Sequence, residues 1–300
     1  MKRLLLVDGN NLVMRYAAVP GLNKMSFSNE PTGGIHGAVL NILQDISTLK
    51  PDEVAIVFDG LGAAEKKRKI YAGYKASRGP MLDSMLGQIE ATRNVLRAAG
   101  LFVFHEAGFD ADDVIGTLAA NFERSVLIKS NDKDFFQLVN NRISVLRPKM
   151  DVWDKRKVKR EIIAPKRFAE YLALCGDSVD GIPGLAGCGP VTALTLLAEY
   201  SWEDLLKKPP IKWAEIIKAQ RKELQAFLRL TRIDCKCLSE THLRRIEPRL
   251  VPGKYSASLI PLLRSKNLRT LESWFKTHQH GVLSSSGTIF DVLHRSKKVK

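Results

Sequence analysis

Two scarcities in the sequence exclude several classes of protein. Only four cysteines are present, and Cys235 and Cys237 have no second ligand pair at a usable spacing, so neither a disulfide framework nor a zinc ribbon fits. No apolar run approaches the roughly 18 residues of a membrane span. The apolar run that follows Arg3 is too short for the core of a secretion signal. We therefore expect a cytoplasmic protein.

Positive charge, in contrast, is abundant. Lysine and arginine number 47 against 32 aspartates and glutamates, a formal net charge of +15 over 300 residues. Hydrophobic residues make up 45% of the chain, which is enough to build a core. A basic surplus of this size favours a polyanionic partner, either nucleic acid or an acidic membrane surface. No strong amphipathic anchor supports the membrane alternative.

Short apolar runs alternate with helical stretches in the first half of the chain. We expect strands at 4–7, 54–58, 101–104, 126–128 and 143–146, and helices most clearly at 36–49, 82–99 and 112–122. This alternation is typical of an α/β domain with a mostly parallel sheet. The length suggests two domains. We place an α/β domain at 1–160, a helical region at 161–280 and a basic tail at 281–300, the tail being either flexible or docked on the core.

Aspartates follow the expected strands or begin the helices after them. The carboxyl ends of parallel strands share one edge, where ligands bind. One aspartate there is most simply a turn or capping residue, but a crowd of them would repel one another unless cations neutralised the charge. Asp177 and Asp180 would share a face if their segment were helical. The nine candidates are Asp8, Asp59, Asp110, Asp112, Asp113, Asp132, Asp134, Asp177 and Asp180.

Oxygen ligands without histidine or cysteine indicate Mg²⁺ or Mn²⁺. Two such ions form the clamp that is used for in-line attack on phosphodiesters. The sequence therefore predicts a metal site for phosphodiester chemistry at the sheet edge.

Two further segments suit contact with a nucleic-acid backbone. The stretch 64–80 mixes cations with tyrosines, which suits phosphate contact and stacking on unpaired bases, or else a solvated helix face. Glycines before Pro190 allow a tight hairpin with outward amides, a helix-hairpin-helix pattern at about 176–200, although an ordinary helix connection is the simpler alternative. The candidate DNA-binding residues are Lys66, Lys67, Arg68, Tyr74, Lys75, Arg78, Gly184, Gly187 and Gly189.

Taken in order, the motifs resemble those of the 5′ nuclease family, which includes flap endonucleases, phage-type 5′–3′ exonucleases and the 5′ nuclease domain of bacterial DNA polymerase I. The similarity runs from about residue 3 to about residue 205 and is looser over 206–278. The motifs are Val7-Asp8-Gly9-Asn10, Phe58-Asp59-Gly60, Gly73-Tyr74-Lys75 with Arg78, Asp110-Ala111-Asp112-Asp113, Asn131-Asp132-Lys133-Asp134, and the run from Gly176 to Gly184.

The resemblance implies a PIN-like fold: a twisted, mostly parallel sheet with flanking helices and a helical arch at about 62–92, followed by the helix-hairpin-helix region. It implies one metal held mainly by Asp8, Asp59, Asp110 and Asp112, and a second held mainly by Asp113, Asp132, Asp134, Asp177 and Asp180. Lys75 and Arg78 would act in catalysis beside Asp59 and Asp112, and a K⁺ ion would sit at the hairpin. The family usually has glutamate at the position of Asp110, so this contact is expected to be weaker or water-mediated.

The resulting hypothesis is a stand-alone, monomeric 5′–3′ exonuclease and flap endonuclease that uses two Mg²⁺ (or Mn²⁺) ions. Its substrates would be branched, flapped or 5′-ended DNA, in replication and repair. A non-catalytic branched-DNA-binding protein is one alternative, against which the full set of acids argues. A PIN-type ribonuclease is another, and the hairpin and the arch favour duplex DNA instead.

Overall fold

The apolar runs of the first half form a sheet at the centre of the molecule. The computed structural model describes residues 2–77, 79 and 81–278. Within these residues, six strands form the sheet in the order β5-β4-β1-β6-β7-β8. All neighbours are parallel except β7 and β8, which are antiparallel. The strands are β1 (Arg3–Asp8), β4 (Glu53–Val57), β5 (Phe102–Phe104), β6 (Ser125–Lys129), β7 (Ile143–Arg147) and β8 (Asp151–Trp153).

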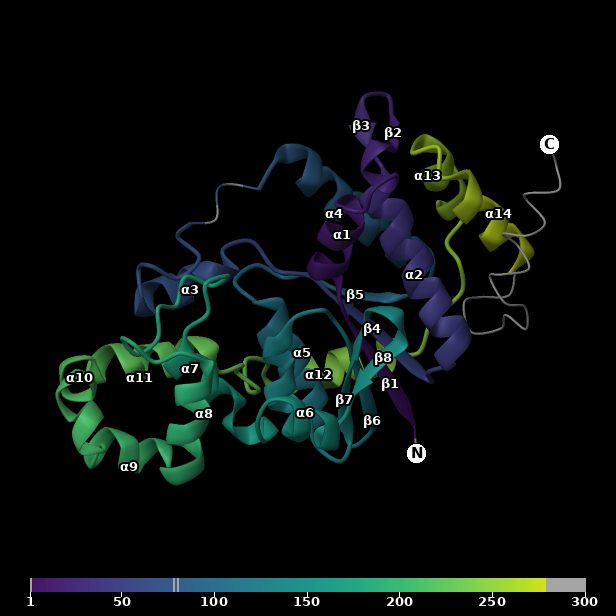
Figure 1. Cartoon of the computed structure of the whole chain (residues 1–300). Coiled ribbons are helices and arrows are strands. Elements are labelled where there is room, and N and C mark those ends of the chain that lie inside the picture. The colour runs from purple at the N-terminus through teal and green to yellow at the C-terminus, as the bar shows by residue number, and fades with distance from the viewer. Residues whose placement is uncertain (1, 78, 80, 279–300) are drawn as a thin grey trace.

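Helices cover both faces of the sheet because buried side chains alternate along its strands. In β1, Leu5 and Val7 belong to the core on one face, whereas Leu4 and Leu6 belong to the core on the other. Figure 1 shows this layered arrangement. The first face is covered by α1 (Gly9–Ala17), α2 (Gly33–Leu49) and α4 (Asp83–Ala98), and the second by α5 (Ala111–Asn121).

The chain beyond β8 continues as helices. Several of them enclose a third apolar core around Leu205, Leu224 and Phe227, and Figure 1 shows this group beside α3 (Ala63–Ile70), the first helix of the expected arch. The helices are α6 (Lys155–Glu161), α7 (Phe168–Cys175), α8 (Pro190–Glu199), α9 (Trp202–Lys207), α10 (Ala214–Ala219) and α11 (Arg221–Thr231).

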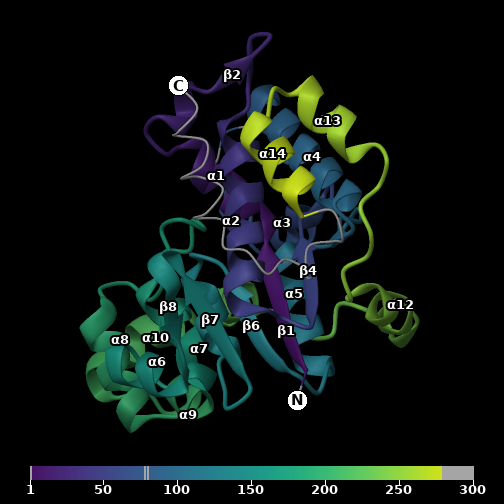
Figure 2. The same ribbon diagram turned by 90° about the vertical axis from the view of Figure 1, so that its right-hand side faces the viewer.

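The last described helices return to the first core. After α12 (Glu240–Ile246), the helices α13 (Leu259–Ser265) and α14 (Arg269–Thr277) lie against α2 and α4, as Figure 2 shows. Leu271 and Trp274 are buried in the same core as Leu5. The expected helical region therefore contributes to all three cores, since Ile246 of α12 is buried in the second. The bounds 1–160 and 161–280 stay predictions. The expected tail at 281–300 lies outside the described residues.

A few short elements have no clear signal in the sequence. These include β8 and the hairpin of β2 (Ser26–Phe27) and β3 (Glu30–Pro31), which are too short to show a period. No described helix combines the length and the apolar character that crossing a membrane requires. The 3₁₀ turns are η1 (Leu22–Lys24), η2 (Lys133–Leu138), η3 (Pro148–Met150), η4 (Pro165–Arg167), η5 (Ile211–Trp213) and η6 (Glu247–Arg249).

Candidate active site

Three of the candidate acids cap the helical segments that they precede. The side chain of Asp8 accepts a hydrogen bond from the backbone N–H three residues later at 3.0 Å. Asp110 and Asp132 each accept from the N–H two residues later, at 3.1 and 2.9 Å. The capping interpretation is therefore correct for all three. Capping also fixes each carboxylate at the carboxyl edge of the sheet.

Ordinary polar residues tie these strand ends together. Asp59 follows β4, and its Oδ1 accepts from the N–H of Ala111 at the start of α5 at 2.9 Å. The Asn10 side-chain oxygen accepts from the N–H of Asp59 at 3.2 Å. Ser130 Oγ donates to Asp8 Oδ2 at 2.8 Å. Sequence reasoning did not assign a role to Asn10 or Ser130, yet both hold the candidate acids in place.

A distant loop also reaches the acids on α5. Asp113 Oδ1 accepts from the N–H of Asp234, in the loop between α11 and α12, at 2.9 Å. One turn along α5, Thr117 Oγ1 donates to the carbonyl oxygen of Asp234 at 3.1 Å. Asp234 therefore brings a tenth aspartate to this region, which the sequence motifs did not include.

Asp177 and Asp180 lie in a turn. Helix α7 ends at Cys175, and Asp177 and Ile182 then exchange two backbone hydrogen bonds of 2.7 and 2.8 Å. The helical face that their spacing suggested is therefore not formed. The turn nevertheless meets the arch, because the carbonyl oxygen of Asp180 accepts from the N–H of Lys75 at 2.8 Å. The Nζ of Lys75 also lies 3.8 Å from Asp180 Oδ1.

The acids are close enough to raise one another's pKa. Burial, together with the charges of Asp59 and Asp132, raises the pKa of Asp8 to about 7. Burial and the charge of Asp110 raise the pKa of Asp113 to about 6. This mutual repulsion shows that the segments converge and that the site favours a cation. For the same two reasons, pKa values are also raised at Asp59, Asp112, Asp132 and Asp134.

Lysine ammonium groups stand among these carboxylates. Lys67 Nζ lies 3.2 Å from Asp110 Oδ2 and 3.6 Å from Asp113 Oδ2. Lys133 Nζ lies 3.1 Å from Asp177 Oδ2. Although burial opposes the effect, the charge of Lys67 lowers the pKa of Asp110. Lys67, which the sequence assigned to DNA contact, is thus directed toward the acids.

The donor set suits a hard divalent cation. Among the described residues, no three aspartate, glutamate, histidine or cysteine side chains gather tightly enough to chelate one ion as they stand. The oxygens at the edge are nevertheless carboxylate oxygens, which Mg²⁺ and Mn²⁺ prefer. Asp134 Oδ1 is buried and has no hydrogen-bond partner within the described part of the chain. A cation would satisfy this acceptor, so the chemistry of the residues fits such an ion.

The expected hairpin connects α7 to α8. Gly184 has φ of +76°, and a Cβ there would lie 2.5 Å from the backbone nitrogen of Gly176, so this position requires glycine on both counts. Gly187 has φ of +74° but open space around it. Gly189 is extended, with φ of −79°, and it precedes Pro190 at the first position of α8.

Comparison with known proteins identifies the family. Residues 3–164 match the model for the N-terminal resolvase-like domain of 5′–3′ exonuclease, and residues 163–251 match its C-terminal SAM fold. A 5′–3′ exonuclease of Aquifex aeolicus is 35% identical over 240 residues, which cover 78% of this chain and 82% of that protein. The chain belongs to the 5′–3′ exonuclease family. The prediction of a 5′ nuclease made from the motifs is therefore confirmed.

Other relatives of this chain are longer than it is or have lower sequence identity to it. A thermostable DNA polymerase I of Thermus filiformis is 36% identical over 243 residues, which are 77% of this chain but only 28% of the polymerase. The zinc-bound T5 5′-exonuclease matches with a TM-score of 0.68 at 18% identity over 83% of this chain and 98% of its own. At that identity the match supports the fold, a mainly parallel sheet followed by a SAM-like helical region. The fold prediction is confirmed.

A cavity of about 690 Å³ opens between the acidic edge and the helices α3 and α4 of the 5′–3′ exonuclease chain. Asp59 and Asp110 line it together with the basic side chains of Arg68, Lys75 and Arg93. It therefore places carboxylates and cations around one space, as a phosphate-processing site requires.

Four of the expected DNA contacts on the arch need comment. Tyr74 is only 1% exposed and packs in the third core, so in this structure it does not offer its ring to an unpaired base. This corrects the stacking role that the sequence suggested. Lys66 and Arg68 are exposed, as a DNA contact requires, and Arg78 lies outside the described residues.

Proposed function

We propose that this chain is a structure-specific 5′ nuclease that hydrolyses phosphodiester bonds in branched, flapped or 5′-ended DNA, as both exonuclease and flap endonuclease. The observation that carries the proposal is the convergence of aspartates from separate segments on one sheet edge, beside a cavity that is also lined by basic residues. Such a site combines cation binding with attraction of a phosphate backbone. We place the protein in the cytoplasm, as a monomer.

The acids would hold two divalent ions, Mg²⁺ or Mn²⁺. Bound there, the ions would supply the positive charge that activates an attacking water and stabilises the leaving 3′ oxygen. Asp110 has a shorter side chain than glutamate, so its contact would run through water. The first set of ligands is Asp8, Asp59, Asp110 and Asp112, and the second is Asp113, Asp132, Asp134, Asp177 and Asp180.

The basic side chains of the arch would have two successive roles, first beside the acids and then beside the phosphate. Lys67 and Lys75 neutralise the acids while no other cation is present, since they lie beside Asp110 and Asp180. Once displaced from Asp110, the ammonium group of Lys67 would join Lys75 and Arg68, which already line the cavity. Positive charge at that position stabilises the charge that develops on the scissile phosphate. Arg78 would join Lys75 in this role.

The hairpin 183–190 would hold duplex DNA through its backbone amides, and it would offer a site for K⁺. The contacts at the hairpin and the arch are all with phosphates. DNA binding should therefore be independent of base sequence and should weaken steeply with salt.

A cleavage assay with a matched pair of variants tests the proposal. Both Asp132 and Asp154 cap a helical segment, and asparagine caps equally well. Asp154 follows β8, which runs antiparallel to β7, so it lies away from the acidic edge. The substrates are a fluorescent 5′ flap, a nicked duplex and a circular single strand, each with Mg²⁺ or EDTA.

We expect Mg²⁺-dependent cleavage of the flap and the nicked duplex only. Asp132→Asn should lower the rate by at least about a hundredfold, the scale on which charge stabilisation acts, and Asp154→Asn should leave it unchanged. Flap binding without cleavage would indicate a non-catalytic binding protein, and preferential cleavage of RNA would indicate a ribonuclease.

A further inference from the structure

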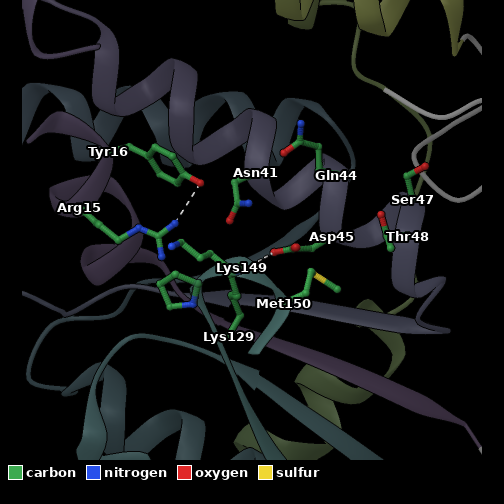
Figure 3. A pocket seen from close by; sticks show the side chains of 11 residues that line it. Arg15, Tyr16, Asn41, Gln44, Asp45, Ser47, Thr48, Lys129, Lys149 and Met150 are labelled. Atoms are coloured by element: carbon green, nitrogen blue, oxygen red, sulfur yellow. Dashed lines mark hydrogen bonds and ion pairs between the residues drawn. The ribbon is translucent and has the colours of Figure 1, made fainter. Parts of the chain in front are cut away.

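A second cavity, of about 270 Å³, lies between α2 and the turn that joins β7 to β8 (Figure 3). Helix α1 contributes Arg15, α2 contributes Asn41 and Asp45, β6 contributes Lys129, and the turn contributes Lys149. None of the nine candidate acids lines this cavity, and neither does any cation of the arch. It is therefore separate from the candidate active site.

The cavity carries an excess of positive charge. Asp45 is the single carboxylate in its described lining, and it pairs with Lys129 at 2.8 Å, with both side chains 4% exposed. Arg15 donates to the hydroxyl of Tyr16 at 3.0 Å. Figure 3 shows the charged ends of Arg15 and Lys149 on the same side of the cavity, below that hydroxyl. Two cations thus face the cavity beyond the neutralised pair.

The backbone that presents Lys149 is strained. Lys149 and Met150 have consecutive positive φ values of 62° and 59°, a left-handed conformation that side chains with a Cβ disfavour. Two consecutive left-handed residues are the usual geometry of a tight hairpin turn, here between the antiparallel strands β7 and β8, but glycine or asparagine is the usual choice there. Here the left-handed turn carries an exposed lysine to the rim of the cavity.

The wall formed by α2 adds an unsatisfied acceptor. Asn41 Oδ1 is buried and has no hydrogen-bond partner among the described residues. This acceptor suits a hydroxyl group, whereas Arg15 and Lys149 suit a phosphate. A sugar phosphate carries both groups. The cavity has the volume of about nine water molecules, which is enough for a sugar with its phosphate.

We propose that this cavity binds one nucleotide unit, with its phosphate on Arg15 and Lys149 and a sugar hydroxyl on Asn41. The unit is either a free nucleoside 5′-monophosphate or the 3′-terminal residue of a DNA strand, since both present a phosphate and a free 3′ hydroxyl. Binding at this site needs no metal ion and no cleavage.

Binding is measured by calorimetry in EDTA, because the acidic edge then repels phosphate. The probes are inorganic phosphate, a 2′-deoxynucleoside 5′-monophosphate and a short single-stranded oligonucleotide. Lys149→Gly removes the charge and accepts the left-handed conformation. It should weaken binding by at least about tenfold, as expected for one charge-assisted hydrogen bond, while the melting temperature rises.

Lys50→Gly is the matched control. Lys50 also has a positive φ, 47°, but it ends α2 outside the cavity lining. This variant loses the same charge and the same strain, so its melting temperature should rise with binding unchanged. Asn41→Ala should weaken binding of the monophosphate but not of inorganic phosphate.

Weaker binding in Lys149→Gly, with unchanged binding in Lys50→Gly, supports the site. The probe whose binding is weakened distinguishes a free nucleotide from a DNA strand. Equal weakening in Lys149→Gly and Lys50→Gly, or no binding of any probe, would overturn the proposal. Because cleavage is not measured, this result is independent of the proposed nuclease activity.

Discussion

Lys67 Nζ lies 3.2 Å from Asp110 Oδ2, and this ion pair joins the first arch helix, α3, to the acidic edge. Both side chains are largely buried, with 13% and 9% exposed. Opposite charges in such a place interact more strongly than at the surface. The pair therefore links the position of α3 to the charge of the site, because a cation bound by Asp110 would compete with the lysine for the same carboxylate.

Replacing Lys67 by methionine should tighten binding of divalent cations. The variant keeps most of the side-chain volume but removes the competing charge, and we expect about tenfold higher affinity, within the usual range of coupling between sites. Calorimetric titration with Mn²⁺ measures it. Lys66→Met, one position away and exposed, is the control, and an equal gain in both variants would argue against competition by Lys67.

Divalent ions should also stabilise the folded protein. Binding at a hundred times Kd adds about 2.7 kcal/mol to the free energy of unfolding, so Mg²⁺ should raise the melting temperature and EDTA should reverse the shift. In Asp134→Asn the shift should shrink, because the buried acceptor Oδ1 belongs to this residue. Without metal, the same variant should melt above the wild type, since it removes one buried repelling charge. If Mg²⁺ raised the melting temperature of Asp134→Asn as much as that of the wild type, Asp134 would be excluded as a ligand.

The free energy of unfolding lost on alanine substitution in the hairpin should depend on the backbone geometry of each glycine. Gly189→Ala should change the free energy of unfolding by less than about 0.5 kcal/mol, because its φ is ordinary and its surroundings are open. Gly187→Ala should cost about 1–2 kcal/mol for the left-handed conformation. Gly184→Ala should cost more, because a Cβ there also meets the backbone. Urea unfolding gives the ranking, and equal losses at Gly184 and Gly187 would contradict the close approach.

Tyr74 should matter for stability rather than for stacking on DNA. Tyr74→Ala should lower the free energy of unfolding by about 3–5 kcal/mol, as for other large aromatic side chains that are buried. Tyr74→Phe keeps the ring and should retain flap affinity, measured by fluorescence anisotropy without divalent ions. A folded Tyr74→Leu variant with much weaker flap binding would restore the stacking role.

The candidate acids could be located from the sequence because they follow buried strands. Asp8 ends β1, and Asp59 and Asp132 follow β4 and β6. A parallel sheet brings such strand ends to one edge, whatever the length of the connections. The capping role of Asp110 could also be predicted from neighbouring residues alone, since aspartate is favoured at the start of a helix.

The remaining parts of the site depend on contacts between distant segments. Asn10, Ser130 and Asp234 act through hydrogen bonds to residues far away in the chain, and such bonds leave no periodic pattern. Tyr74 lies among cations in the sequence, but its burial is decided by helices that come much later. The three-residue spacing of Asp177 and Asp180 fits both a helix and a turn, so it could not distinguish between them.

The turn from Asp177 to Ile182 joins three parts of the molecule at once. It carries two of the acids and leads directly into the hairpin. At Gly181 a Cβ would lie 2.5 Å from the carbonyl oxygen of Gly73, so the turn also presses against the base of the arch. If the hairpin binds duplex DNA, the length of this turn sets how many base pairs separate the hairpin contact from the scissile phosphodiester bond. Inserting one residue there would shift the cut along the strand, whatever the base sequence.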